Sequence, residues 1–269
     1  MKFLVQLARI IVGALFIFSG FVKLVDPIGS KYKFQEYFSE DVLNLEFLIP
    51  YALPFAIILI VAEILLGVMI LIGYKSKLTV WSLFLLTLIF LFLTWYSAYY
   101  NKVTDCGCFG DAIKLSTWET FYKNIILIGL IIVLLLKVAF IKPIFKGKTP
   151  MIITFLSLAL FLFTVKHVLT HLPLIDFRAY AIGKNIPEGM VFPADGSIAP
   201  VHDFMLEDAQ ADLAPELLRQ EKVMLVIVYN LDKADVNGFR AIKEIGIKAK
   251  KKGYTVYGVS ASFSDDLVL

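Results

Sequence analysis

The chain has 269 residues, of which 59% are hydrophobic and 18% are charged. Soluble domains are about 45–50% apolar and about 25% charged, so this composition excludes an ordinary soluble enzyme as well as a disordered chain. Two cysteines are too few for a disulfide-held secreted scaffold, and no basic run interleaves with aromatic residues, so we expect no nucleic-acid partner. Residues 1–173 carry an excess of basic side chains and residues 174–269 an excess of acidic ones, which predicts a membrane part followed by a polar tail.

Five stretches are long enough to cross a bilayer, which takes about 20 apolar residues in a helix. They cover roughly residues 3–25, 48–72, 78–100, 121–140 and 150–172. Loops on the side of the N-terminus hold lysines and no acidic residue, whereas loops on the other side mix lysines with Asp and Glu. The positive-inside rule therefore predicts a cytoplasmic N-terminus and a periplasmic tail, in a bacterial inner-membrane protein whose first partner is the lipid bilayer.

Glu63 lies within the second span, where charges are costly and usually have a partner. Counting about 1.5 Å of depth per residue puts Arg9 nearer to the level of Glu63 than Lys23 is, so an intramembrane pair of Glu63 with Arg9 is predicted. Either this pair holds the first two spans together, or Glu63 marks a proton or quinone-headgroup site.

The first long loop, residues 26–47, carries apolar and aromatic residues at mixed helical spacing. It is predicted to be either an amphipathic helix on the outer leaflet or an ordered cap over the bundle.

Both cysteines lie in the loop after the third span, which reads Asp105-Cys106-Gly107-Cys108-Phe109-Gly110. The predicted orientation exposes this loop to the periplasm, where disulfides persist. A bridge across one residue would close so small a loop that it would stabilise little, and strained, exposed bridges are the labile ones. We therefore favour a redox-active pair, Cys106 and Cys108, over two inert thiols in a tight turn.

Two histidines, His167 and His171, share a helix face at the end of the fifth span. With Cys106 and Cys108 they would make a tetrahedral metal site, which is the weaker interpretation because no spacing rule links the two elements. We expect no metal, and interfacial polar histidines.

The tail begins with a linker at residues 174–222 that contains several prolines and a short predicted helix over 207–220. Val223–Tyr229 is an apolar run typical of a buried strand, Val236–Lys252 has helical periodicity, and Tyr254–Ser260 is a second strand. This order predicts a βαβ unit.

The membrane part resembles the DoxX-like and MauE-like family over about residues 1–140. The resemblance is carried by Arg9, by Ser19-Gly20-Phe21-Val22-Lys23-Leu24, by Ala62-Glu63-Ile64-Leu65-Leu66-Gly67 and above all by Cys106-Gly107-Cys108-Phe109-Gly110. It implies a four-helix core and redox chemistry at the membrane. MauE-like members are linked to the maturation of periplasmic methylamine dehydrogenase through disulfide formation, and DoxX-like members to quinone-dependent oxidoreductases.

The tail resembles the first half of a thioredoxin-like fold. That family carries its cysteine pair after the first strand, where this chain reads Asn230-Leu231-Asp232-Lys233-Ala234-Asp235. Since no cysteine is present there and only nine residues follow Ser260, we expect an incomplete, cysteine-free form of that fold.

These observations predict an all-α transmembrane bundle, a four-helix core plus a fifth span, with a small α/β outer domain. The expected divisions are residues 1–140 for the core, 141–173 for a cytoplasmic loop and the fifth span, 174–222 for the linker, and 223–269 for the βαβ unit. The expected function is thiol–disulfide exchange or electron transfer at the periplasmic face, with a periplasmic thiol protein as partner and a quinone as carrier. The alternative is a non-catalytic anchor or maturation subunit of a quinone-linked oxidoreductase.

Overall fold

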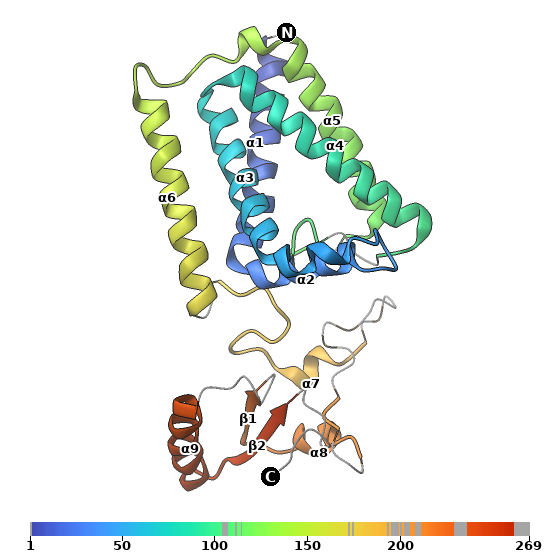
Figure 1. The fold of residues 1–269 in the computed structure, drawn as a ribbon, viewed down its shortest axis with the longest axis vertical. Coiled ribbons are helices and arrows are strands. Elements are labelled where there is room, and N and C mark those ends of the chain that lie inside the picture. The colour runs from blue at the N-terminus through green and yellow to red at the C-terminus, as the bar shows by residue number, and fades with distance from the viewer. Residues whose placement is uncertain are drawn as a thin grey trace. The chain divides into compact units, whose positions relative to one another are not determined.

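The computed structural model describes residues 2–103, 107–110, 112–113, 115–171, 173, 175–192, 194, 199, 201, 205–207, 211–228 and 236–260. The chain divides into two compact units, Met1–Arg178 and Ala179–Leu269 (Figure 1). The first unit is helical, and the second contains the strands.

Five helices of the first unit are long and apolar enough to cross a membrane. They are α1 (Lys2–Val25), α3 (Ala52–Ile72), α4 (Ser76–Tyr100), α5 (Thr117–Leu136) and α6 (Thr149–Thr170), with the 3-10 turns η1 (Glu46–Tyr51) before α3 and η2 (Val138–Phe140) after α5. This confirms the five predicted spans, and the chain is an integral membrane protein.

The helices α1 and α3 approach each other closely because glycines line their contact. A Cβ atom added to Gly67 would lie 2.8 Å from Ile17 Cγ1 and 2.9 Å from the carbonyl oxygen of Gly13. Small residues let helix backbones pack tightly in membranes, where no hydrophobic effect drives the helices together. The contact sets the register of the pair, with Gly13 beside Ile70 and Gly20 beside Glu63.

The buried core of the bundle is shared mainly by α1, α3, α4 and α5, through Val12, Ile70, Leu83 and Ile131. The fifth span, α6, is attached more lightly. Its Val165 joins a separate cluster on α1 and α3, whereas most of its large apolar side chains are exposed.

A short helix, α2 (Pro27–Phe38), lies across one end of the bundle (Figure 1). Asp26 caps it by accepting a hydrogen bond from the Gly29 N–H at 3.0 Å, and Pro27 occupies its first turn. Tyr37 and Phe38 are buried, which supports the ordered-cap interpretation of residues 26–47. We call this the loop end of the bundle, where α1, α4 and α6 end and where α3 and α5 begin.

The second unit contains α7 (Ile186–Gly189), α8 (Ala214–Leu217), β1 (Val223–Val228), α9 (Val236–Lys251) and β2 (Thr255–Ser260). The strands β1 and β2 are parallel, with Val223 opposite Thr255 and Val228 opposite Ser260, so the predicted βαβ order is confirmed. The described residues form one two-stranded sheet. Asn230–Asp235, where a thioredoxin-like fold would carry its cysteines, lies outside the described residues.

The helix predicted over residues 207–220 is too long, because among the described residues of this stretch, 207 and 211–220, only Ala214–Leu217 is α-helical. Glu207 and Asp212 form an antiparallel bridge, and the Asp212 carboxylate accepts hydrogen bonds from the N–H groups of Leu206 and Ala214, both at 2.9 Å. Aspartate competes in this way with helical backbone bonding, so the helix begins after it.

Candidate functional site

The described part of the cysteine loop, residues 107–110, forms a tight turn that is fitted against α1. The Gly110 N–H donates to the Gly107 carbonyl at 3.1 Å, and both glycines have positive φ, +64° and +49°. A Cβ on Gly110 would also lie 3.0 Å from Val22 Cγ1. The turn therefore depends on glycine at both positions, for backbone conformation and for space.

Cys108 is buried in this turn, with 7% of its surface exposed. Next to it, the Phe109 ring packs 5.5 Å from that of Phe18 on α1, and the Lys123 ammonium of α5 stands 4.5 Å from the Phe109 ring centroid. The loop is thus held between two spans. The predicted site residues Asp105 and Cys106 lie outside the described residues.

A buried ion pair lies in the bundle beneath this turn. Lys23 Nζ of α1 is 3.0 Å and 2.8 Å from the two carboxylate oxygens of Glu63 on α3, and the two residues are 6% and 1% exposed. The predicted pairing of Glu63 with Arg9 is therefore wrong, because Glu63 pairs with Lys23.

The physical reason is the register of the two helices. The depth count treated the ends of the first two spans as level, but α1 starts well beyond the end of α3. Arg9 accordingly lies beside the last turn of α3, where its Nε and Nη2 donate to the carbonyls of Ile70 and Leu71 at 2.7 Å and 2.6 Å. Its Nη1 donates to the Gln6 side chain and to the Lys142 carbonyl.

Ser19 connects the ion pair to the cysteine loop. Lys23 Nζ donates to Ser19 Oγ at 2.8 Å, and Ser19 Oγ donates to the Cys108 carbonyl at 2.8 Å. The same hydroxyl is 3.3 Å from Glu63 Oε2, but it has a single hydrogen to give. The sequence analysis named Ser19 within a family motif but gave it no role, although Ser19 and Lys23 are four residues apart and so share a helix face.

Two pockets flank the loop. The first, which we call the bundle pocket, lies among the spans and has a volume of about 20 Å³. It is lined by Ser19, Glu63, Phe90, Cys108, Lys123, Asn124 and neighbouring apolar residues. The predicted redox residue Cys108 and the predicted intramembrane carboxylate Glu63 thus face one cavity, although they lie 45 positions apart in the sequence.

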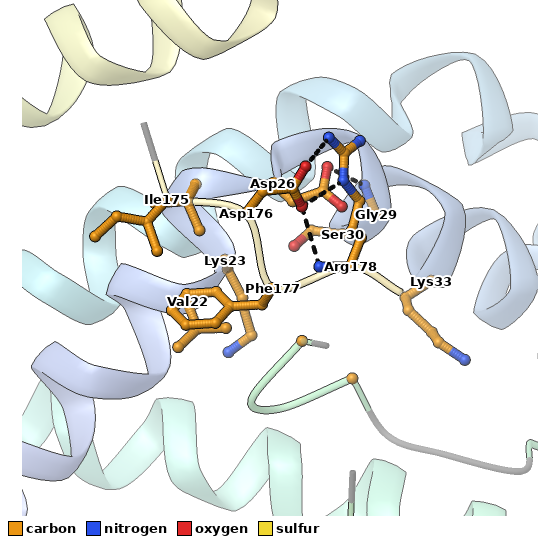
Figure 2. A pocket seen from close by; sticks show the side chains of 13 residues that line it. Val22, Lys23, Asp26, Gly29, Ser30, Lys33, Ile175, Asp176, Phe177 and Arg178 are labelled. Carbon is orange, nitrogen blue, oxygen red and sulfur yellow. Dashed lines mark hydrogen bonds and ion pairs between the residues drawn. The ribbon is translucent and has the colours of Figure 1, made fainter. Parts of the chain in front are cut away.

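The second, the surface pocket, has a volume of about 130 Å³ and is shown in Figure 2. It is lined by Lys23, Lys33, the two loop glycines and residues 175–178, which follow α6. Arg178 Nη2 lies 2.6 Å from Asp176 Oδ2, and this hydrogen-bonded pairing holds the pKa of the Asp176 carboxyl below its ordinary value. The sequence had placed these residues in a linker and gave no sign of them.

The two histidines of the weaker metal interpretation are at the end of α6. The rings of His167 and His171 stack with centroids 4.7 Å apart. Among the described residues, no three His, Cys, Asp or Glu side chains gather as metal ligands would.

One comparison with known proteins gives a match. The model of the family described as "Methylamine utilisation protein MauE" matches residues 1–137, which cover α1 to α5 and the cysteine loop. No curated protein and no solved structure matches the chain.

Proposed function

Because this chain belongs to the MauE family, we propose that it matures periplasmic proteins of methylamine utilisation by thiol–disulfide exchange at Cys106 and Cys108. The observation that carries the proposal is the seating of Cys108, in a glycine turn held against two spans and hydrogen-bonded through Ser19 to a buried ion pair.

The proposed chemistry passes through a mixed disulfide. One loop thiolate attacks a partner disulfide and expels one partner thiolate, which takes up a proton. The second loop thiolate then attacks the mixed bond, leaving a loop disulfide and a reduced partner. Run in reverse, the same steps oxidise a partner dithiol and leave the loop as two thiols.

A loop that oxidises partners must give its electrons to a carrier. We propose a quinone in this role, because two thiols that form a disulfide release the two electrons and two protons that a quinone takes up to become a quinol. A quinone would also agree with the resemblance of the core to the DoxX-like family.

The charge of the loops supports a cytoplasmic N-terminus, which would put the cysteine loop and residues 179–269 in the periplasm. We propose that residues 179–269 form a thioredoxin-like module that docks a thiol partner. The parallel βαβ order of β1, α9 and β2 supports this assignment.

A second candidate is a non-catalytic subunit that anchors an oxidoreductase in the membrane. It is favoured by the burial of Cys108, which leaves little of the residue open to a partner. In that function the thiols never cycle.

Mixed-disulfide trapping separates the two candidates. In membranes that contain the full chain, Cys106→Ser and Cys108→Ser are each expressed alone, and thiols are quenched with acid and alkylated with a mass tag. We expect one single variant to accumulate a disulfide-linked partner, because its resolving cysteine is missing. The double variant is the control.

If neither single variant traps a partner and the wild-type pair stays in one redox state, the anchoring function is correct and the exchange function is wrong. A membrane-impermeant maleimide, applied to intact spheroplasts, tests the topology separately. Labelling only after permeabilisation would contradict a periplasmic loop.

A further inference from the structure

We infer that Lys23, Glu63 and Ser19 form a positioning group that sets the reactivity of Cys108, by holding its carbonyl and by balancing charge beneath its thiol. The inference rests on the proposed use of Cys108 as a reactive thiol. It names residues that neither touch a partner nor belong to the cysteine loop.

The mechanical part follows from the hydrogen bonds. Ser19 Oγ accepts from Lys23 Nζ and donates to the Cys108 carbonyl, both at 2.8 Å. Lys23 in turn is fixed by both carboxylate oxygens of Glu63. The loop is thereby tied to α1 and α3 through the side chain of Ser19. Lys23 and Glu63, which hold Ser19 in place, are themselves immobilised by burial.

The electrostatic part follows from the neutrality of the pair. Lys23 and Glu63 are both buried, so neither charge is screened well by water. Together they present no net charge to the loop, but removing one member would leave a full charge a few hydrogen bonds from Cys108. A remaining positive charge favours a thiolate and a remaining negative charge disfavours it.

Other charged groups also lie near the loop, and they are the same in all the variants that the test below compares. Lys123 on α5 lies over the Phe109 ring, and Lys33 on α2, which is paired with Glu36, packs against Gly107. Asp105 and Asp111 are in the loop itself, and Asp26, Asp176 and Arg178 line the surface pocket. None of them is changed by the variants below.

The test measures how fast Cys108 is alkylated by a small neutral reagent as a function of pH. The full chain is used in detergent or lipid nanodiscs, with Cys106→Ser as the background so that one thiol reacts. We expect Glu63→Gln to lower the pH of half-maximal rate and Lys23→Met to raise it, each by about one unit. The double variant is expected to return close to the background value.

The diagnostic result is that the pH of half-maximal alkylation shifts in opposite directions in Glu63→Gln and Lys23→Met. A purely structural role would shift it in the same direction in both variants. Arg9→Met is the matched control, since it removes a buried positive charge near the opposite end of α1 and should leave the midpoint unchanged. Shifts of equal sign, or none, would overturn the electrostatic part.

A second pair of variants keeps the inference testable if either charge variant fails to fold. Ser19→Ala removes the tie to the loop, whereas Ser76→Ala removes a similar hydroxyl bond, to the Ile141 carbonyl at 3.0 Å, at the other end of the bundle. We expect alkylation of Cys108 to become about tenfold faster in Ser19→Ala only, a change that corresponds to one lost hydrogen bond. Equal rates in the two variants would overturn the mechanical part.

Failure here is distinguishable from failure of the proposed function. Alkylation needs no partner, so mixed disulfides could still be trapped even if these residues proved irrelevant to Cys108.

Discussion

The two ends of α1 each bury a cation, and they neutralise it in different ways. Near the N-terminal end, Arg9 is surrounded by carbonyl oxygens from the last turn of α3 and from Lys142. Near the loop end, Lys23 meets the carboxylate of Glu63. Carbonyl dipoles at a helix C-terminus stabilise a cation locally, and at Arg9 they make no connection to the cysteine loop. The carboxylate pair instead continues through Ser19 to a loop with a cysteine. The contrast indicates that the first end serves stability and the second serves the site.

The largest expected effect comes from breaking the carboxylate pair. Lys23→Met or Glu63→Leu alone should each lower the free energy of unfolding by about 3–5 kcal/mol, because the remaining charge is left buried without a partner. The double variant Lys23→Met/Glu63→Leu should recover most of that loss. Unfolding by denaturant in detergent micelles, followed by circular dichroism, measures all three, and additive losses in the double variant would argue against a direct pairing.

The next largest loss of stability is expected from substitution of Arg9, near the N-terminal end of α1. Arg9→Met should lower the free energy of unfolding by about 2–3 kcal/mol, since buried carbonyls lose their donors. No single removal of an acidic residue should rescue it, because its partners are backbone carbonyls and the uncharged side chain of Gln6. Lys77→Met, at an exposed position near the same end, is the control and should be close to neutral. A loss as small as that of the control would show that water replaces the guanidinium.

The smallest expected loss of stability concerns the close contact between α1 and α3, which sets the register of these two helices. Gly67→Ala forces a methyl group against Ile17 and the Gly13 backbone, and should lower the free energy of unfolding by about 1–2 kcal/mol. Gly129→Ala, on α5 with open space around it, should be neutral or slightly stabilising. The same measurement in micelles compares the two. An equal response at both positions would mean that the approach of α1 to α3 is not tight.

Sequence alone was sufficient where a single element carries its own signal. The five spans and the βαβ order of the tail follow from local hydrophobicity and periodicity, and the structure contains them. The pairing of Glu63 was missed because it depends on the offset between two helices. That offset is set by glycine contacts, which no count of depth along a single span includes.

The candidate site was predictable only in part for the same reason. Cys108 and Glu63 were each singled out, but nothing in their spacing placed them on one cavity. Ser19 was named within a family motif but given no role, because two of its hydrogen-bond partners, Glu63 and the Cys108 carbonyl, lie on other elements. The segment 175–178 was missed because it acquires its place only by packing on distant helices.

The Ser19 hydroxyl has two acceptors within reach and one hydrogen for them. Rotation about a single C–O bond decides whether the loop backbone or the membrane carboxylate receives it. The loop backbone and the carboxylate therefore compete for one hydrogen, and its transfer from one acceptor to the other needs only a torsion of one side chain, with no movement of a helix axis. Rotation of the Ser19 hydroxyl is fast, and a measurement that follows only the backbone would not detect it.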